Sequence, residues 1–393
     1  MHAVIDPRVM AVPADISLVR GGPFFRFQQA VGLIRPNQWN IGGRSAVLIA
    51  IAWLPLLAIT ALLNPAALRS LLADYRVYAR LFIAIPVLLS GEIFLDSRFR
   101  TVLGSIDESN LLDESDTAYM DGVMATIARF RDSLVPEFLI LGLLIAYVVT
   151  SYHGLVDATL WLGQGEGADI HLTAAGWYGV LVGAFLWNFL LALALWRWLL
   201  WTYFAFKLSK RHLRVVATHP DGHGGIGFLG LMVEAFAPIA LVVACVIGAT
   251  WRQNILHHGT HVMSYKVPAI VLAAMIAVAA LGPLLFFAPR LFGLRRKGIR
   301  EYGALGHLNS TEFHEKWIAH RAGHEVDFLQ APESSRLCSY GQIYEKIGKL
   351  KPFPVDKGSL YVLAIAVVLP LLPAVLTEIP FVVVIKDLLK ALR

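Results

Sequence analysis

Long apolar segments, separated by polar ones, dominate the hydrophobic pattern of the chain. A bilayer-spanning α-helix needs roughly 20 predominantly apolar residues, and six segments approach or exceed that length: 45–63, 80–95, 135–152, 176–206, 226–250 and 267–289. A seventh begins at Ser359 and is interrupted by Pro370, Pro373 and Pro380. Membrane helices tolerate proline as a kink. The pattern therefore predicts an all-α fold, a polytopic transmembrane helical bundle of about seven spans, within a range of six to eight.

The polar segments divide the chain into four parts. We expect an N-terminal cytoplasmic segment with a short interfacial helix, a transmembrane region, a cytoplasmic helical region, and a last proline-broken span with a tail; these are 1–43, 44–289, 290–358 and 359–393. The transmembrane region includes a polar segment, 96–134, whose apolar residues Met120, Met124 and Ile127 recur at helical spacing. An amphipathic helix is predicted there.

Two helices are predicted in the polar region 290–358. The first starts near Asn309, whose side chain caps the helix together with Glu312 three residues later, and it runs through His324. The second covers 334–350 and ends before Pro352.

Composition supports a chain that lies mostly in lipid. Hydrophobic residues make up 57% and charged residues 16% of the 393, against about 45–50% and about 25% in soluble domains. The alternating pattern of an outer-membrane β-barrel is absent. The net charge of +6 comes from basic residues between the apolar segments. That distribution indicates membrane topology and contact with anionic lipid, and no nucleic-acid partner is expected.

The basic residues also predict an orientation. Most of the 34 Lys and Arg residues lie in segments that alternate spans place on one side: 1–43, 96–134, 207–225 and 290–358. By the positive-inside rule this side, with the N-terminus, is cytoplasmic. Lys386, Lys390 and Arg393 do not fit this scheme, so the side reached by the C-terminus stays open. No signal peptide is expected, since Asp6 and Asp15 interrupt the first thirty residues.

Four charged residues are predicted to lie within the membrane, near the cytoplasmic end of the spans. They are Glu92, Glu137, Arg197 and Glu234. Charges in lipid are costly and normally face a bundle interior or a water-filled pathway. In the alternative interpretation, Glu92 and Glu137 reach the interface and Arg197 pairs with one of them. Glu234, about 12 Å along its helix, is the strongest single candidate.

The loop 219–225 is predicted to lie beside these charges. It contains His219, Asp221 and His223, followed by Gly224 and Gly225 at the start of a span. Free N–H groups and the helix dipole at such a start favour an anion, and the three side chains suit a divalent metal. The third interpretation is a tight turn in which Asp221 caps the helix.

Other histidines are weaker candidates. His320 and His324 are four residues apart on a predicted helix, a spacing that suits metal ligation, although no His-Glu-x-x-His motif is present. His257, His258 and His261 lie in a predicted outer loop. A solvated polar surface is the preferred interpretation of both groups. No cofactor is expected beyond a divalent metal as an open alternative. A disulfide is not expected, because Cys245 lies in an apolar segment and Cys338 in a polar one.

Several features together resemble a group of bacterial multi-spanning inner-membrane proteins with no known activity. They are the stretch 53–57, Asp74 with Arg80 and Pro86, the loop 219–225, and the proline-broken C-terminus. The resemblance implies a bacterial inner-membrane location and carries no activity.

The sequence favours transport over catalysis. Walker A, GxGxxG, GxSxG and HExxH motifs in the right context are absent, so an enzyme is not expected. The first hypothesis is a homo-oligomeric channel or transporter for an ion or small solute. The second is a membrane sensor or scaffold that binds a cytoplasmic partner through 290–358. A membrane-embedded metalloenzyme ranks last.

Overall fold

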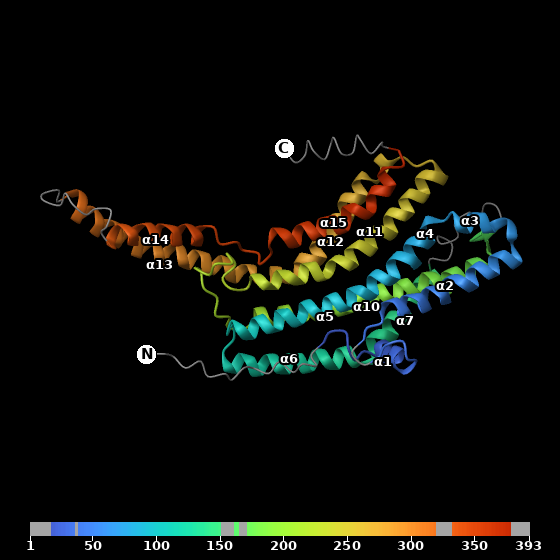
Figure 1. Cartoon of the computed structure of the whole chain (residues 1–393), viewed down its shortest axis with the longest axis horizontal. Coiled ribbons are helices and arrows are strands. Elements are labelled where there is room, and N and C mark those ends of the chain that lie inside the picture. Colours follow the sequence, from blue (N-terminus) through green and yellow to red (C-terminus); the bar gives the residue numbers. More distant parts are fainter. Residues whose placement is uncertain (1–16, 36–37, 151–160, 165–170, 320–331, 379–393) are drawn as a thin grey trace.

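Long helices form almost the whole molecule and run roughly along its long axis (Figure 1). The computed structural model describes residues 17–35, 38–150, 161–164, 171–319 and 332–378. Within these ranges the only strands are β1 (Gly163–Gln164) and β2 (His171–Leu172), which pair antiparallel. The predicted all-α fold is confirmed.

Six helices of the described chain are long and apolar enough to cross a membrane. In order they are α2 (Ile41–Leu63); α4 (Tyr75–Tyr78) with α5 (Ile85–Glu108); α9 (Ala174–Tyr178) with α10 (Phe185–Ser209); α11 (Leu231–His258); α12 (Lys266–Leu285); and α15 (Lys357–Val375). The remaining predicted span, the third along the chain (135–152), is α7 (Leu134–Thr150), which is apolar but shorter. All seven predicted spans are therefore helices, and six meet the length of a full crossing.

Two of the spans contain a π-helical segment. One, Ala79–Ala84, joins α4 to α5, and the other, Gly179–Ala184, joins α9 to α10. The two segments pack against each other. A π segment fits one extra residue into a helix turn and is frequent at functional sites. Both lie in apolar sequence, where hydrophobicity alone gives no sign of them.

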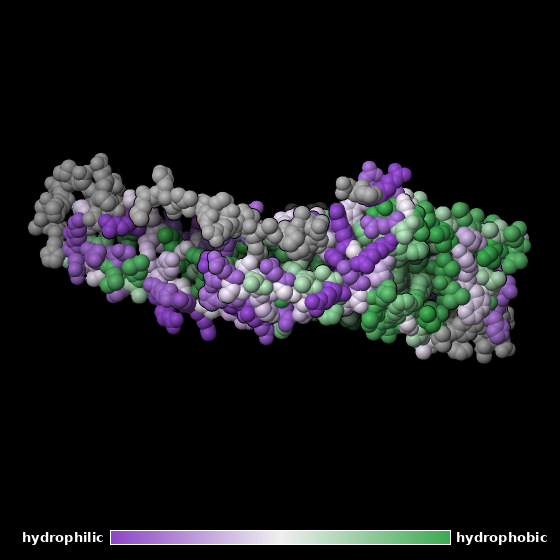
Figure 2. Space-filling model, turned by 90° about the horizontal axis from the view of Figure 1, so that it is seen from below, coloured by the Kyte–Doolittle hydropathy of each residue, from purple (hydrophilic) through white to green (hydrophobic). Residues whose placement is uncertain are grey.

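The polar helices extend from one end of the bundle, called here the hairpin end. α13 (Ala288–His314), a π-helical segment (Glu315–Ala319) and α14 (Pro332–Gly348) form an antiparallel hairpin that projects beyond the other helices (Figure 1). α6 (Glu114–Asp132) lies beside the ends of α5 and α10. Hydrophilic side chains gather over this half of the molecule and apolar ones over the other (Figure 2). The opposite end, called the loop end, carries η1 (Pro65–Ala67), α3 (Leu68–Leu72), β1, β2 and η6 (Val262–Tyr265).

Two predicted boundaries in the polar regions are wrong. Asn309 does not begin a helix, because α13 starts at Ala288 and passes through it. The segment that follows Asp96 is likewise part of the second span's helix, which continues to Glu108. In both places a helix continues from apolar into polar sequence, since neither stretch contains a proline to end it.

α11 is the central helix of the bundle and packs against α5 and α15. Gly248 within it, and Gly230 directly before it, allow close approach to the C-terminal segment. A Cβ built on Gly248 would lie 2.8 Å from the carbonyl oxygen of Pro370, and one on Gly230 would lie 2.8 Å from that of Pro354. On the other side of the bundle, the short helix α1 (Pro23–Ala30) packs against α7. α5 also packs against α2 and α10.

Candidate functional site

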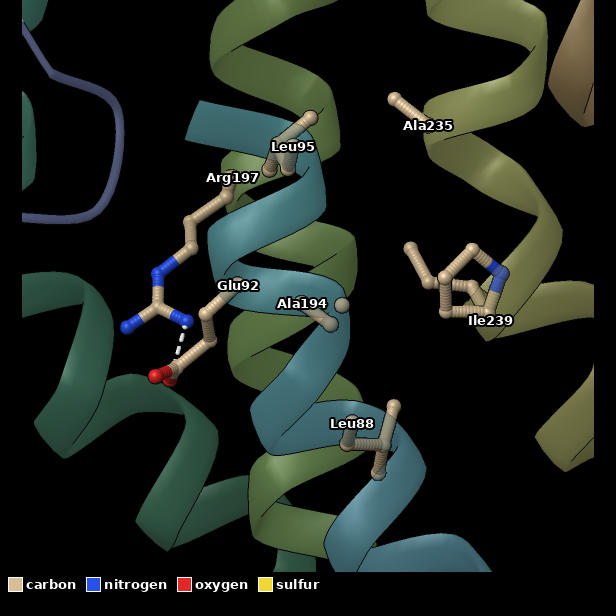
Figure 3. A pocket seen from close by; sticks show the side chains of 9 residues that line it. Leu88, Glu92, Leu95, Ala194, Arg197, Ala235 and Ile239 are labelled. Atoms are coloured by element: carbon tan, nitrogen blue, oxygen red, sulfur yellow. Dashed lines mark hydrogen bonds and ion pairs between the residues drawn. The ribbon is translucent and has the colours of Figure 1, made fainter. Parts of the chain in front are cut away.

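Glu92 lies at the centre of a buried charge cluster that joins three membrane helices. Its Oε2 accepts a hydrogen bond from Arg44 Nη2 of α2 at 2.7 Å, and its Oε1 accepts one from Arg197 Nη1 of α10 at 2.6 Å. The side chains of Arg44, Glu92 and Arg197 are 0%, 4% and 9% exposed. Figure 3 shows the Arg197 and Glu92 side chains meeting. Arg44, Glu92 and Arg197 are called the charge triad below.

The polar surroundings of the triad include donors that lack acceptors. Gln28 of α1 is buried, and its Oε1 accepts a hydrogen bond from Arg44 Nε at 2.5 Å. Arg44 Nη1 and Gln28 Nε2 are both buried and make no hydrogen bond with the residues that the structure describes. With two arginines to one carboxylate, the triad itself carries one excess positive charge.

Glu137 is a further carboxylate that acts on the triad. It lies in the first turn of α7, is half-buried, and is near enough to Arg197 to interact with its charge. Its Oε1 accepts a hydrogen bond from the backbone N–H of Phe24 at 3.0 Å, at the start of α1. Glu137 therefore holds α1, and with it Gln28, against the triad.

A small apolar gap lies beside the triad, between α5, α10 and α11. Its lining residues are Leu88, Gly91, Glu92, Leu95, Ala194, Arg197, Ala235, Pro238 and Ile239. The charged groups of Glu92 and Arg197 point away from the side occupied by Ala235 and Ile239 (Figure 3). The cavity volume is about 10 Å³, close to the minimum for one water molecule. In this conformation the helices are closed around the triad.

Glu234 of α11 forms a second ion pair, with Arg98 of α5. Its Oε2 lies 2.7 Å from Arg98 Nη2, and its Oε1 accepts a hydrogen bond from Ser359 Oγ at 3.2 Å. The side chains of Glu234 and Arg98 are 18% and 33% exposed. Glu234 thus binds α11 to α5 and to the start of α15, and the structure does not bring it into the charge triad.

The side chain of Asp221 holds the loop 219–225 together by accepting hydrogen bonds from backbone N–H groups. Its carboxylate accepts hydrogen bonds from the N–H groups of His223, Gly225 and Gly227 at 2.8 to 3.1 Å, and lies 2.9 Å from His219 Nδ1. Gly224 and Gly225 have φ of +70° and +93°, which L side chains rarely adopt. The backbone N–H groups that would bind an anion are therefore already bonded to Asp221. This arrangement agrees with the interpretation of the loop as a tight turn.

The electrostatics of this loop are consistent with a charged Asp221 and a neutral His223. Burial raises the pKa of Asp221, but the hydrogen bonds from His223, Gly227, His219 and Gly225 outweigh it and lower this pKa below its usual value. His223 is buried, with 4% of its surface exposed. Burial is the main reason that the pKa of His223 is lowered. The negative charge of Asp221 opposes this shift, and the positive charge of Lys351 adds to it.

The structure describes only part of the histidine candidates. His320 and His324 lie outside the described residues. His261 Nδ1 is 3.4 Å from Glu378 at the loop end, and His257 and His258 form the end of α11. Among the described residues, no group of three or more His, Cys, Asp or Glu side chains is placed to hold a metal ion.

Sequence reasoning missed several members of these clusters: Arg44, Gln28, Arg98 and Ser359. Arg44 directly precedes an apolar segment, where a basic residue normally marks the membrane boundary. Its one distinguishing signal is the pair Gly42-Gly43 before it, which is too weak to identify a buried arginine. Comparison with family models, with curated proteins and with solved structures finds no match for this chain.

Proposed function

We propose that this protein is an integral membrane channel or transporter for an ion or small solute, with the charge triad as its gate. The observation that carries the proposal is the burial of Arg44, Glu92 and Arg197 where three membrane helices meet. Charged side chains in such positions are expensive and usually mark a pathway. A bacterial inner membrane, a cytoplasmic hairpin end and a homo-oligomeric assembly are parts of the same proposal.

The proposal treats the described conformation as a closed one. The gap beside the triad has room for about one water molecule, so a solute passes only after α5, α10 and α11 separate. Prolines inside α11 and α15, at Pro238, Pro370 and Pro373, remove backbone hydrogen bonds and allow these helices to bend. Pro238 lines the gap itself.

Flux from proteoliposomes tests this function. The purified full-length protein is reconstituted and loaded with a panel of cations, anions and small neutral solutes, and release is followed against empty liposomes. We expect selective release of at least one solute. Absence of release for every solute, from protein shown to be folded by its thermal transition, would remove the proposal.

The second candidate function, a membrane sensor or scaffold, is favoured by the projecting hairpin α13–α14. Its surface is mostly polar, but it also carries Leu305, Leu308 and Ile318, whose exposed fractions are 50%, 61% and 53%. Apolar side chains on a projecting element suit a protein partner. Loss of a stoichiometric partner on deletion of Pro332–Gly348, together with no flux in the wild type, would select this function.

A further inference from the structure

Arg80 is an arginine in a membrane span, and its Nε has no acceptor among the described residues. It lies in the π-helical segment Ala79–Ala84, about 7.5 Å along the helix from Tyr75 at the loop end. Within the described residues its Nε is buried and makes no hydrogen bond, while the side chain as a whole is partly exposed. The centre of the Trp187 ring lies 6.0 Å from its guanidinium carbon.

The adjacent carboxylate, Asp74, is fully used by other donors. Its Oδ1 accepts hydrogen bonds from the N–H and the Nε of Arg76 at 2.9 and 3.0 Å. Its Oδ2 accepts hydrogen bonds from Arg76 Nη2 at 3.0 Å and from Trp161 Nε1 at 3.1 Å. A carboxylate offers about four acceptor positions, so Asp74 has none left for Arg80.

A second donor without an acceptor lies beside Arg80. Trp187 Nε1 is buried and makes no hydrogen bond in the described structure. Trp187 follows the π-helical segment Gly179–Ala184, which packs against the segment that carries Arg80. The packing of these two π segments therefore brings the Arg80 guanidinium within 6.0 Å of the ring that carries the second unpaired donor. Each such buried donor costs free energy until an acceptor reaches it.

The local charge favours an anion as that acceptor. Within the described residues, the titratable groups whose charges act on Arg80 are Arg76, Asp74 and Tyr147. Since Asp74 balances Arg76, the charge of Arg80 is left over. Arg252 of α11, which lies over the Tyr75 ring at 4.1 Å, adds a further positive charge at the loop end. Water does not reach the Nε of Arg80, so this donor is left for another acceptor.

We propose that Arg80 and Trp187 bind a phosphate group, either that of a lipid head group or free phosphate. A guanidinium matches phosphate oxygens with two parallel N–H donors, and the indole N–H supplies a third. The short distance to the loop end of the helix places Arg80 within reach of head groups. This site is about 18 Å along the helix from Glu92, so it goes beyond the proposed gate and is independent of it.

Thermal stabilisation by phosphate ligands tests the site. The full-length protein is purified in a neutral detergent without phosphate, and its unfolding midpoint is titrated with inorganic phosphate and, separately, with phosphatidylglycerol in the micelles. Micelles with diacylglycerol, which lacks the phosphate, are the lipid control. Stabilisation as a function of ligand gives an apparent affinity. The compared proteins are wild type, Arg80→Gln, Trp187→Phe and Arg69→Gln, the last removing an exposed arginine of α3 at the same end.

We expect Arg80→Gln to weaken the apparent affinity about tenfold or more, and Arg69→Gln to leave it unchanged. Stabilisation by phosphatidylglycerol alone identifies a head group as the ligand, and stabilisation by inorganic phosphate identifies free phosphate. The proposal is overturned if neither ligand stabilises the wild type, or if Arg69→Gln loses as much as Arg80→Gln. If Arg80→Gln does not fold, Trp187→Phe decides, with weaker binding expected and unchanged binding contradicting the site.

Discussion

Replacement of Glu92 by glutamine tests how the charge triad holds the bundle together. The variant keeps the size of the side chain and removes its charge, so Arg44 and Arg197 lose their shared counter-ion. Both arginines are at least 91% buried as side chains, with 0% and 9% exposed. Neither has another carboxylate in ion-pair contact within the described residues.

The magnitude follows from this burial. At an effective dielectric constant of about 20, two charges about 4 Å apart interact with about 4 kcal/mol, and burial has already removed most of the hydration of both partners. Removing one partner of a buried pair costs about 3–5 kcal/mol. The matched variant is Glu234→Gln, whose pair with Arg98 is more exposed, at 18% and 33%. A pair of that exposure contributes about 1 kcal/mol or less.

Thiol reactivity during heating measures the difference. Cys245 lies half-buried on α11 and Cys338 is exposed on α14, so a Cys338→Ser background leaves Cys245 as a reporter of unfolding in the spans. We expect the midpoint of Glu92→Gln to lie well below that of Glu234→Gln, which stays near the parent protein. Equal midpoints for the two variants would refute the assignment of the triad as a buried, coupled ion cluster.

Three further predictions concern the loop and the packing of α11. Because the pKa of His223 is lowered in the folded state, the unfolded state takes up the proton first, so stability is lost as pH falls below about 6.5; His223→Gln should flatten this decline in melting temperature, and an unchanged pH profile would contradict it. The pKa of Asp221 is also lowered, so its contribution is present above the usual aspartate pKa and is lost at lower pH, near or below about 4; Asp221→Ala should destabilise the protein at pH 7 by about 1.5–3 kcal/mol, and a melting temperature equal to wild type would exclude its role as the hub of the loop. Gly248→Ala places a Cβ 2.8 Å from the Pro370 carbonyl oxygen and should cost about 1–3 kcal/mol; Gly282→Ala, with nothing within 4 Å of its Cβ, should leave the melting temperature the same or higher, and equal effects of the two would contradict the close packing of α11 on α15.

The apolar pattern was sufficient to predict the helices of the membrane region. A run of about 20 apolar residues has few alternatives to a spanning helix, because lipid leaves no other partner for the backbone N–H and C=O groups. Helix ends in polar sequence were harder to predict. Asn309 has the residue type and spacing of an N-cap, but α13 passes through it, since a cap motif acts only where the preceding residues leave the helix.

The charged residues show a second limit of sequence reasoning. Spacing along a helix gives the depth of Glu92, Arg197 and Glu234. A pair of Arg197 with Glu92 or Glu137 was the alternative interpretation. Spacing does not give the rotation of each helix about its axis. That rotation places Glu92 against Arg44 and Arg197 and Glu234 against Arg98, so residues of similar depth belong to separate clusters.

Solute flux through variants of the triad tests the proposed gate most directly. Wild type, Glu92→Gln and Glu234→Gln are reconstituted at equal protein content, and release of the solute that the wild type conducts is measured at a temperature below all three unfolding midpoints. The proposed gate predicts that Glu92→Gln changes the rate or the pH dependence of release, whereas Glu234→Gln behaves as wild type. Wild-type release from Glu92→Gln, with folded protein in the membrane, would contradict the assignment of the charge triad to the pathway.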